Sequence, residues 1–431
     1  MKILLIATNQ AERYMDRMVV RPLPIGVAYL AAHIDEERHD LRVLDLMFSR
    51  DAVADVDTAV TSFRPALVGL SIRNLDNQSF LNPVWHLPAV REIVRRIRAA
   101  EDTTIICGGP AFSMLPAECL EYLNADVGFA GDAMESFALA MDRIEDGEEY
   151  RDIPGLVYRE RDGGRIVVQE GQASSNFSRP PRLDLLDTAR YDKAGFGIGV
   201  VTKLARDYYP HAGENRQSAG DGWYIRPVDE VVEEIRRLQE DFGIRKLFFI
   251  DSGFNALLDH AKALCGALIE SGLRIRWNSL LKPGTCDAEL LGLMRRSGCS
   301  LALMGGLEPA SQAGERLSER LEGAQRIAAL CRQAGVPFTS SLTFGEPGET
   351  EATVNRKLEF LKHVRPDFAT LRIGTRVLPG TGLAALAREE GLIGSDRDLL
   401  GPTFYVAESV REWIADHLRR EAATHLRWNL L

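Results

Sequence analysis

The chain has 431 residues, of which 45% are hydrophobic, so it is long enough for two or three domains with buried cores. Its formal net charge of -10 argues against binding to nucleic acid, because that binding depends on fields of Lys and Arg. No apolar run reaches the roughly 20 residues that span a bilayer, and residues 1–5 begin a strand-like run rather than a signal sequence. We therefore expect a cytoplasmic protein without nucleic-acid or membrane partners.

The first 150 residues alternate short β-type runs with amphipathic stretches. This alternation predicts a doubly wound, Rossmann-like parallel sheet, with strands at residues 2–8, 41–46, 66–71, 104–108 and 126–131. Ligands of such sheets lie beyond the carboxyl ends of the strands. The candidate ligand-binding residues are therefore those at and just after these ends: Thr8, Asn9, Ser71, Arg73, Asn74, Gly108 and Gly109.

Gly108-Gly109-Pro110 predicts a tight strand-to-helix turn in which backbone can approach a ligand closely. A purely structural turn explains the same residues equally well. The segment contains neither GxGxxG nor GxxxxGK[ST], so neither a dinucleotide nor a P-loop nucleotide is indicated. We expect these loops to hold some other large ligand.

Residues 151–191 are charged and contain Gly, Pro and Ser, which predicts a connector with a small hairpin. A second βα series follows, and it predicts an open partial (β/α)6 barrel over residues 192–385, with its site on the carboxyl-end loops. Its strand candidates are residues 197–204, 246–251, 275–281, 301–307, 337–344 and 368–377. Residues 386–431, which include a helix predicted at 409–422, are expected to form a helical cap.

Several segments in both halves of the chain resemble segments of one known group of proteins. PLPIGVAYLAAHI, VGLSIRNLDNQ, IICGGPAFSMLP and VGFAGDAMESF are similar to the cobalamin-binding domain that precedes radical SAM enzymes. RPVDEVVEEI, FFIDSGFN, LMRRSGC, SLTFGEPGET and VLPGTGLA resemble the partial barrel of the same proteins. The chain thus resembles the cobalamin-dependent radical SAM superfamily over nearly its whole length, which implies that the large ligand of the first domain is cobalamin.

The chain departs from this family where three cysteines of a TKxGCxxxCxxC loop hold a [4Fe–4S] cluster. In register with Thr202-Lys203, the cysteine positions are occupied by Arg206, Pro210 and Gly213, none of which binds iron. The six cysteines of the chain lie far apart and are expected to be buried thiols. We therefore expect no [4Fe–4S] cluster and no ordinary radical SAM chemistry.

The altered loop offers other chemistry. Tyr208, Tyr209, His211 and Glu214 would supply aromatic walls and acid/base groups where the resemblance places the upper face of the corrin, and these four are the candidate catalytic residues. The spacing of Asp207, His211 and Glu214 also suits a metal site on a helix, but Pro210 and Gly213 disfavour a helix there. We favour a solvated loop and predict no metal site.

S-adenosylmethionine is the second cofactor that the resemblance implies. Gly306 and Glu308, in the loop Gly305-Gly306-Leu307-Glu308, and the loop Gly345-Glu346-Pro347-Gly348-Glu349 are similar to loops that hold it in relatives. The alternative is that these loops persist only as turns that stabilise the barrel.

Three functions remain open at this point. The leading hypothesis is a cobalamin-dependent enzyme with non-radical or cobalt-centred chemistry, either methyl transfer through methylcobalamin or a cyclisation or rearrangement. Its substrate would be a small molecule of specialised metabolism. The second is a catalytically inactive cobalamin-binding sensor or protein partner of an active radical SAM enzyme. The third is a radical SAM methyltransferase with unusual cluster ligands.

Overall fold

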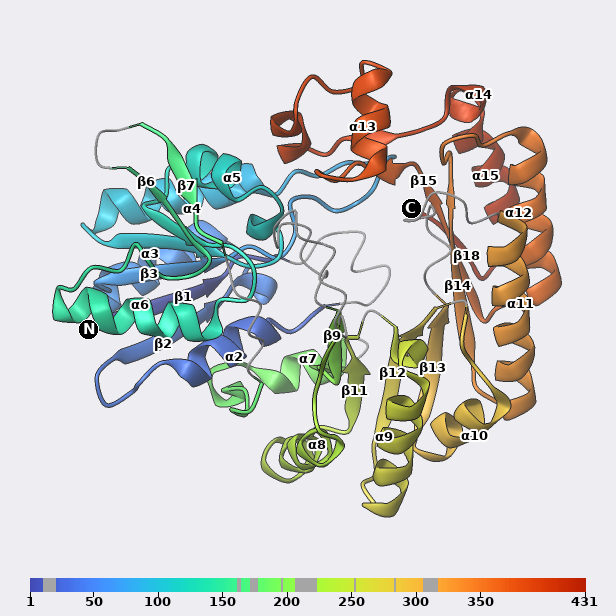
Figure 1. Cartoon of the computed structure of the whole chain (residues 1–431), viewed down its shortest axis with the longest axis horizontal. Helices are drawn as coiled ribbons and strands as arrows, with labels where there is room; N and C mark the ends of the chain where they lie inside the picture. Colours follow the sequence, from blue (N-terminus) through green and yellow to red (C-terminus); the bar gives the residue numbers. More distant parts are fainter. Residues whose placement is uncertain are drawn as a thin grey trace.

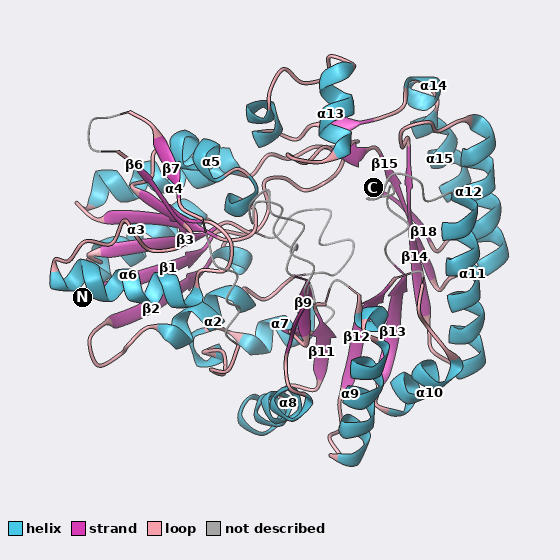
Figure 2. Cartoon of the chain, in the orientation of Figure 1, coloured by secondary structure: helices cyan, strands magenta, loops and turns pink. Residues whose placement is uncertain are grey.

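The computed structural model of the chain describes residues 1–10, 21–160, 164–170, 177–194, 197–205, 223–251, 253–282, 284–304 and 317–431. Within these residues, the chain forms two seven-stranded β-sheets, each flanked by helices (Figures 1 and 2). The first sheet is drawn in blue to green and the second in green to red. The predicted α/β architecture is confirmed.

The first sheet has the strand order β2-β1-β3-β4-β5-β6-β7. Its first five strands pair in parallel, and all five lie where the sequence predicts them. They are β1 (Lys2–Ala7), β2 (Asp40–Asp45), β3 (Leu67–Ser71), β4 (Thr104–Gly108) and β5 (Val127–Phe129).

Helices cover both faces of this sheet, which explains why β1 is an almost continuous apolar run. Leu4 and Ile6 pack into one core cluster, and Ile3 and Leu5 pack into another on the opposite face. The first face is covered by α3 (Ala52–Phe63), α4 (Leu87–Ala100) and α5 (Pro116–Leu123), and the second by α2 (Ile25–His33) and α6 (Met134–Asp146).

The hairpin predicted within residues 151–191 is present, but it does not serve as a connector. Its strands are β6 (Leu156–Arg159) and β7 (Ile166–Val168). β6 pairs antiparallel with β5, and β7 pairs antiparallel with β6, so the first sheet continues to Val168. The sequence of the hairpin cannot indicate this pairing, because the pairing depends on β5, which lies earlier in the chain.

The second sheet has the strand order β18-β15-β14-β13-β12-β11-β8, and its strands are all parallel. The six predicted barrel strands are confirmed as β8 (Ile198–Val200), β11 (Lys246–Phe249), β12 (Arg276–Leu281), β13 (Cys299–Met304), β14 (Phe338–Phe344) and β15 (Phe368–Ile373). A short antiparallel pair, β9 (Lys203–Ala205) and β10 (Trp223–Ile225), stands beside them.

Helices pack on one face of the second sheet, as in a (β/α) barrel. After α7 (Thr188–Ala194), they are α8 (Val228–Phe242), α9 (Leu258–Glu270), α10 (Ala288–Arg296), α11 (Leu317–Ala334) and α12 (Glu351–Val364). Side-chain caps fix two helix starts, since Asp287 accepts from Leu290 N and Thr350 accepts from Thr353 N. No helix in the described ranges is both long and apolar enough to cross a membrane.

The expected helical cap is present, but it also contributes strands. It contains α13 (Gly382–Glu389), α14 (Glu408–Arg411) and α15 (Ile414–Ala423), so the single helix expected at 409–422 is broken after Arg411. β16 (Thr375–Arg376) pairs with β17 (Phe404–Tyr405), and β18 (Trp428–Leu430) joins the second sheet beside β15.

Buried polar contacts join the two domains through α2 and α8. The Tyr29 hydroxyl donates to both carboxylate oxygens of Glu234 at 3.0 Å, and Arg226 lies 2.8 Å from the same carboxylate. Burial raises the pKa of Glu234, although Arg226 opposes that shift. Because all three side chains are buried, their mutual bonds replace the water that each loses.

A second interdomain contact comes from the segment that links β3 to α4. Asp76 in this segment pairs with Arg376 of β16, and both side chains are almost fully buried. The remaining Arg376 donors reach the carbonyl oxygens of Val377, Leu399, Thr403 and Gly401. The segment after β3 is therefore fixed on the second domain.

Candidate functional site

Hydrogen bonds bring the predicted turns of the first domain together at the carboxyl edge of the sheet. Both the backbone N–H and the hydroxyl of Thr8 donate to the carbonyl oxygen of Ser71, at 3.2 and 2.9 Å. Ile72 N donates to Gly108 O at 2.8 Å, and Ala111 N donates to Ile72 O at 3.0 Å. The ends of β1, β3 and β4 thus form one continuous surface.

Gly109 is required by this geometry. Its φ is +99°, and a Cβ atom there would lie 2.7 Å from Ile72 O, which is closer than side chains tolerate. The neighbouring Ser113 donates to Gly109 O at 2.9 Å and accepts from Gly131 N at 2.9 Å. Ser113 therefore ties the turn after β4 to the turn after β5. Sequence reasoning missed this residue, although its position four residues after Gly109 was a usable signal.

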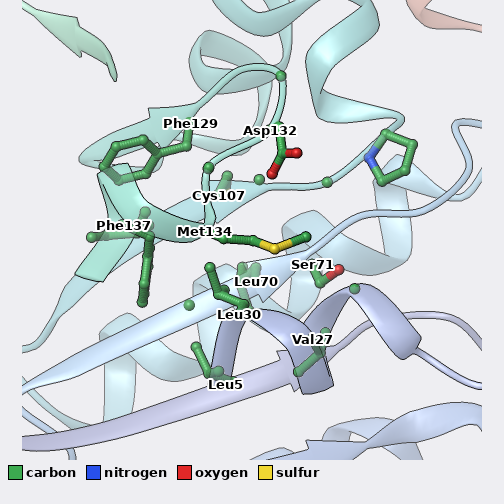
Figure 3. A pocket seen from close by; sticks show the side chains of 18 residues that line it. Leu5, Val27, Leu30, Leu70, Ser71, Cys107, Phe129, Asp132, Met134 and Phe137 are labelled. Carbon is green, nitrogen blue, oxygen red and sulfur yellow. The ribbon is translucent and has the colours of Figure 1, made fainter. Parts of the chain in front are cut away.

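A pocket of about 160 Å³ opens at this edge, on the face of the sheet that α2 and α6 cover. Figure 3 shows Met134 between Asp132 on one side and Leu30 and Leu70 on the other. Apart from Ser71 and Asp132, the side chains that line it are apolar. The lining residues are Leu5, Gly26, Val27, Leu30, Gly69, Leu70, Ser71, Ile106, Cys107, Gly108, Gly109, Pro110, Phe129, Gly131, Asp132, Ala133, Met134 and Phe137.

Three of the lining glycines keep space open. A Cβ atom at Gly26 or Gly131 would meet nothing within 4 Å, and one at Gly108 would meet only Phe129 O at 3.6 Å. The result is an apolar pocket with a polar rim, which is the usual form of a cofactor site. A large flat cofactor with an apolar aromatic end, as cobalamin has, fits these residues.

The seven residues predicted to contact cobalamin divide into two groups. Ser71, Gly108 and Gly109 line the pocket, whereas Thr8, Asn9, Arg73 and Asn74 do not. Thr8 is buried, and its hydroxyl is used to join β1 to β3. As cobalamin contacts, all seven remain predictions.

The second domain begins with a buried ion pair. Lys203 Nζ lies 2.7 Å from Asp251 Oδ2, and neither side chain is exposed to solvent. Thr202 donates its hydroxyl to the same carboxylate oxygen at 2.5 Å, and Lys203 also donates to Phe254 O. Asp251, at the end of β11, thereby fixes the segment from which the altered loop departs.

The residues predicted for catalysis and for S-adenosylmethionine binding lie outside the residues that the structure describes. Tyr208, Tyr209, His211 and Glu214 fall in the interval 206–222, and Gly306 and Glu308 fall in 305–316, both outside the described residues. Their roles stay predictions.

The loop 345–349, by contrast, is described, and a buried ion network supports it. Lys357 Nζ lies 2.5 Å from both Glu346 Oε2 and Glu349 Oε2, and Arg320 reaches Glu346 at 3.3 Å. Glu349 also accepts from Gly345 N at 3.1 Å. Both glutamates are thus engaged inside the protein, which supports the interpretation of this loop as a stabilising turn.

The cysteines are buried except for Cys286, which is half-buried. Burial raises the pKa of Cys107, Cys286 and Cys331 to about 12 and that of Cys265 to about 11, and it also raises the pKa of Cys119 and Cys299. Thiols with such pKa values stay protonated near neutral pH. In the described part of the chain, no three His, Cys, Asp or Glu side chains gather as a metal site would require.

Comparison with known proteins supports the assignment of both domains. Residues 18–139 match the model of the B12 binding domain family. A solved structure of the methyltransferase TsrM from Kitasatospora setae, with cobalamin and a [4Fe–4S] cluster bound, superposes with a TM-score of 0.81 at 21% identity, over 100% of this chain and 93% of that one. The chain therefore shares its fold with that methyltransferase structure. All the residues that line the pocket described above, except Leu5, lie within the matched B12 binding domain.

Curated relatives extend this likeness over most of the sequence. An uncharacterised methyltransferase of Pyrococcus horikoshii is 25% identical over 399 residues, which cover 91% of this chain and 84% of the relative. The tryptophan 2-C-methyltransferase of Streptomyces laurentii is 22% identical over 450 residues, which cover 85% and 72%. The fold class and the cobalamin-binding domain predicted from sequence are therefore confirmed.

Proposed function

We propose that the chain is a cobalamin-dependent methyltransferase acting on a small molecule. The observation that carries this proposal is the pocket at the carboxyl edge of the B12 binding domain, where several glycines leave space for a cofactor. The names of the relatives support methyl transfer over the cyclisation or rearrangement left open by the sequence.

Different residues of the first domain would bind the aromatic end and the corrin of cobalamin. The apolar side chains of Val27, Leu30 and Phe137 would enclose its aromatic end, because they lie deep between sheet and helices. Ser113 and Gly109 hold the two turns that would support the corrin. Cobalamin bound there would supply the chemistry of a cobalt-borne methyl group.

We further propose that the chain works without a [4Fe–4S] cluster, by non-radical or cobalt-centred chemistry. Arg206, Pro210 and Gly213 stand where the family has cysteines. The burial of the described cysteines supports this proposal, because within the described residues they do not gather with other ligands as a metal site would require. The second candidate is a methyltransferase with a cluster held by other ligands, which the cluster in the superposed TsrM structure favours.

In the proposed site, Tyr208, Tyr209, His211 and Glu214 position and deprotonate the acceptor. A neutral imidazole titrates near working pH, so His211 is the base we expect. Substitution His211→Ala should lower turnover about 100-fold or more, the usual scale for loss of a general base, with cobalamin still bound. Equal turnover in His211→Ala and wild type would remove His211 from the mechanism.

The deciding experiment combines metal analysis with the ultraviolet–visible spectrum. The protein is purified from cobalamin-fed cells and reconstituted anaerobically with iron and sulfide. Cobalt near stoichiometric with no iron is the expected result, and iron at cluster level would overturn the cluster-free proposal. Incubation with S-adenosylmethionine labelled in its methyl group, followed by mass spectrometry of small-molecule products, then tests methyl transfer itself.

A further inference from the structure

Apolar side chains close the inner end of the cofactor pocket. Leu5 of β1, Phe129 of β5 and Phe137 of α6 line this end, and each is at most 3% exposed. The two phenylalanine rings meet edge to face, with their centroids 5.8 Å apart. Figure 3 shows both rings at the end of the pocket away from Ser71. A ligand that enters from the carboxyl edge would therefore place its far end against hydrocarbon.

Gly69 allows two of these side chains to pack across β3. A Cβ atom at Gly69 would lie 2.7 Å from Leu5 Cδ2 and 3.6 Å from Phe137 Cζ. The shorter distance is closer than side chains tolerate, so any other residue at this position would displace Leu5. Leu30 of α2 adds a fourth apolar side chain to the wall. The sheet and both covering helices thus contribute hydrocarbon to the same space.

Hydrogen-bonding groups are lacking at this inner end, among the residues that the structure describes. The polar side chains of the lining, Ser71 and Asp132, belong to the turns at the carboxyl edge. The backbone groups of β1, β3 and β4 pair with neighbouring strands. None of the buried side-chain nitrogen or oxygen atoms that lack a partner in the described chain belongs to a lining residue. A polar group placed at the inner end would therefore stay unpaired.

Corrinoids share the corrin ring and differ in the base at the end of their nucleotide tail. In cobalamin this base is dimethylbenzimidazole, whose outer edge carries two methyl groups and no hydrogen-bonding group. In pseudocobalamin it is adenine, whose outer edge carries an amino group and ring nitrogens. Burial of methyl groups is favourable, whereas burial of polar groups without partners is unfavourable. An apolar pocket therefore distinguishes the two bases.

We propose that the inner end of this pocket selects the corrinoid by its base, so that the chain binds dimethylbenzimidazole cobalamin and discriminates against corrinoids with a purine base. The residues that set this preference are Leu5, Leu30, Phe129 and Phe137. The inference rests on the proposed function in one respect, namely that a corrinoid is the ligand of the pocket. It goes further, because contacts with the base rather than with the corrin decide which corrinoid is bound.

The test is a set of corrinoid titrations of the full-length protein, prepared without cobalamin and followed by absorbance. Cobalamin is compared with pseudocobalamin and with cobinamide, which lacks the nucleotide tail. Cobalamin should bind about tenfold or more tightly than pseudocobalamin, because adenine leaves buried polar groups unpaired. Equal affinities for these two would overturn the proposal. Equal affinities for cobalamin and cobinamide would also overturn it, since the tail would then lie outside the pocket.

A variant tests whether the apolar wall is the source of the preference. Leu30→Gln places an amide in the pocket that can pair with adenine, so the affinity ratio of cobalamin to pseudocobalamin should fall to about threefold or less. Both affinities are measured on the same preparation, so a loss of folded protein cancels from the ratio. An unchanged ratio in Leu30→Gln would overturn the proposal.

The matched control is Leu139→Gln on α6. Leu139 is 42% exposed and does not line the pocket, so this variant should keep the wild-type ratio. An equal fall of the ratio in both variants would show that the effect does not come from the pocket, and it would overturn the proposal.

The titrations also separate this inference from the proposed function. Equal affinities together with methyl transfer from labelled S-adenosylmethionine would reject the selectivity and leave the methyltransferase standing. A preference for cobalamin without any methyl transfer would leave the selectivity standing and reject the proposed function. Absence of binding by all three corrinoids would reject both.

Discussion

Arg376 donates through Nε to Oδ2 of Asp76 at 2.6 Å, across 300 residues of sequence and between the two domains. Removal of one partner of a buried ion pair leaves the other charge uncompensated. We therefore expect Arg376→Met to lower the free energy of unfolding by about 3–5 kcal/mol, measured by chemical denaturation. The double variant Asp76→Asn/Arg376→Met should lose less than the sum of its single variants.

The control for this cycle is another interdomain pair, Arg397 with Glu121, whose side chains are 69% and 46% exposed. Exposed pairs contribute about 0–1 kcal/mol, so Arg397→Met should change stability little. If Arg376→Met and Arg397→Met lower the free energy of unfolding by the same amount, the buried pair does not hold the domains together.

Gly26 tests the pocket without disturbing the fold. It lies in α2, lines the pocket, and has nothing within 4 Å of an added Cβ atom. Gly26→Leu should therefore place its side chain in the cofactor space and weaken cobalamin binding about tenfold or more, a loss of about 1.4 kcal/mol. Stability should stay equal or rise, because leucine favours a helix. A cobalamin titration followed by absorbance measures the affinity.

The matched control is Gly266→Leu, since Gly266 lies in α9 with the same open surroundings but far from the pocket lining. That variant should bind cobalamin as the wild type does. Unchanged affinity in Gly26→Leu would place the cofactor elsewhere.

Gly109 tests the turn that Ser113 supports. Gly109→Ala should destabilise the protein by about 1–3 kcal/mol, because the left-handed backbone and the contact with Ile72 O act together. Gly147→Ala is the comparison, since Gly147 has a φ of +70° but no atom within 4 Å of an added Cβ. The amount by which Gly109→Ala lowers the free energy of unfolding more than Gly147→Ala does measures the contact of the added Cβ atom with Ile72 O. Equal losses in the two variants would show that this contact does not destabilise the protein.

His260 predicts a pH dependence of stability. Burial lowers its pKa, and its Nε2 lies 3.1 Å from the carbonyl oxygen of Arg226, at the domain interface. The native state therefore binds fewer protons at this site than the unfolded chain does, so stability rises with pH across the titration. This contribution is complete above the ordinary pKa of histidine and is lost as the pH falls through the lowered value.

Unfolding by urea at several pH values between about 7 and 5 checks the sign, because that interval spans ordinary histidine titration. His260→Gln should flatten the slope, whereas His363→Gln, on an exposed surface histidine, should leave it unchanged. Equal slopes in wild type and His260→Gln would assign the acid sensitivity to other groups.

The strands were predictable because their apolar runs are local features. β1 reads KILLIA and is buried by helices on two sides, and the barrel strands follow one another at regular spacing with helices between. The turns Ser71 and Gly108-Gly109 were predictable for the same reason, since parallel strands bring their carboxyl ends to one edge.

Long-range pairings could not be predicted in this way. β18 joins β15, and β6 joins β5, through backbone bonds that any apolar strand could make. The side-chain contacts of Tyr29 with Glu234, and of Asp76 with Arg376, join residues more than 200 positions apart. Such contacts follow from the complete fold, and no spacing along the sequence indicates them.

Helix α2 has two roles that lie on different sides of the same short helix. Gly26, Val27 and Leu30 line the cofactor pocket, while Tyr29 is held by Glu234 of the second domain. A chimaera in which the first domain is replaced by that of a relative would therefore exchange a pocket wall and a docking contact together. To transplant this domain with its function, Arg226 and Glu234, which contact Tyr29, must be exchanged together with it.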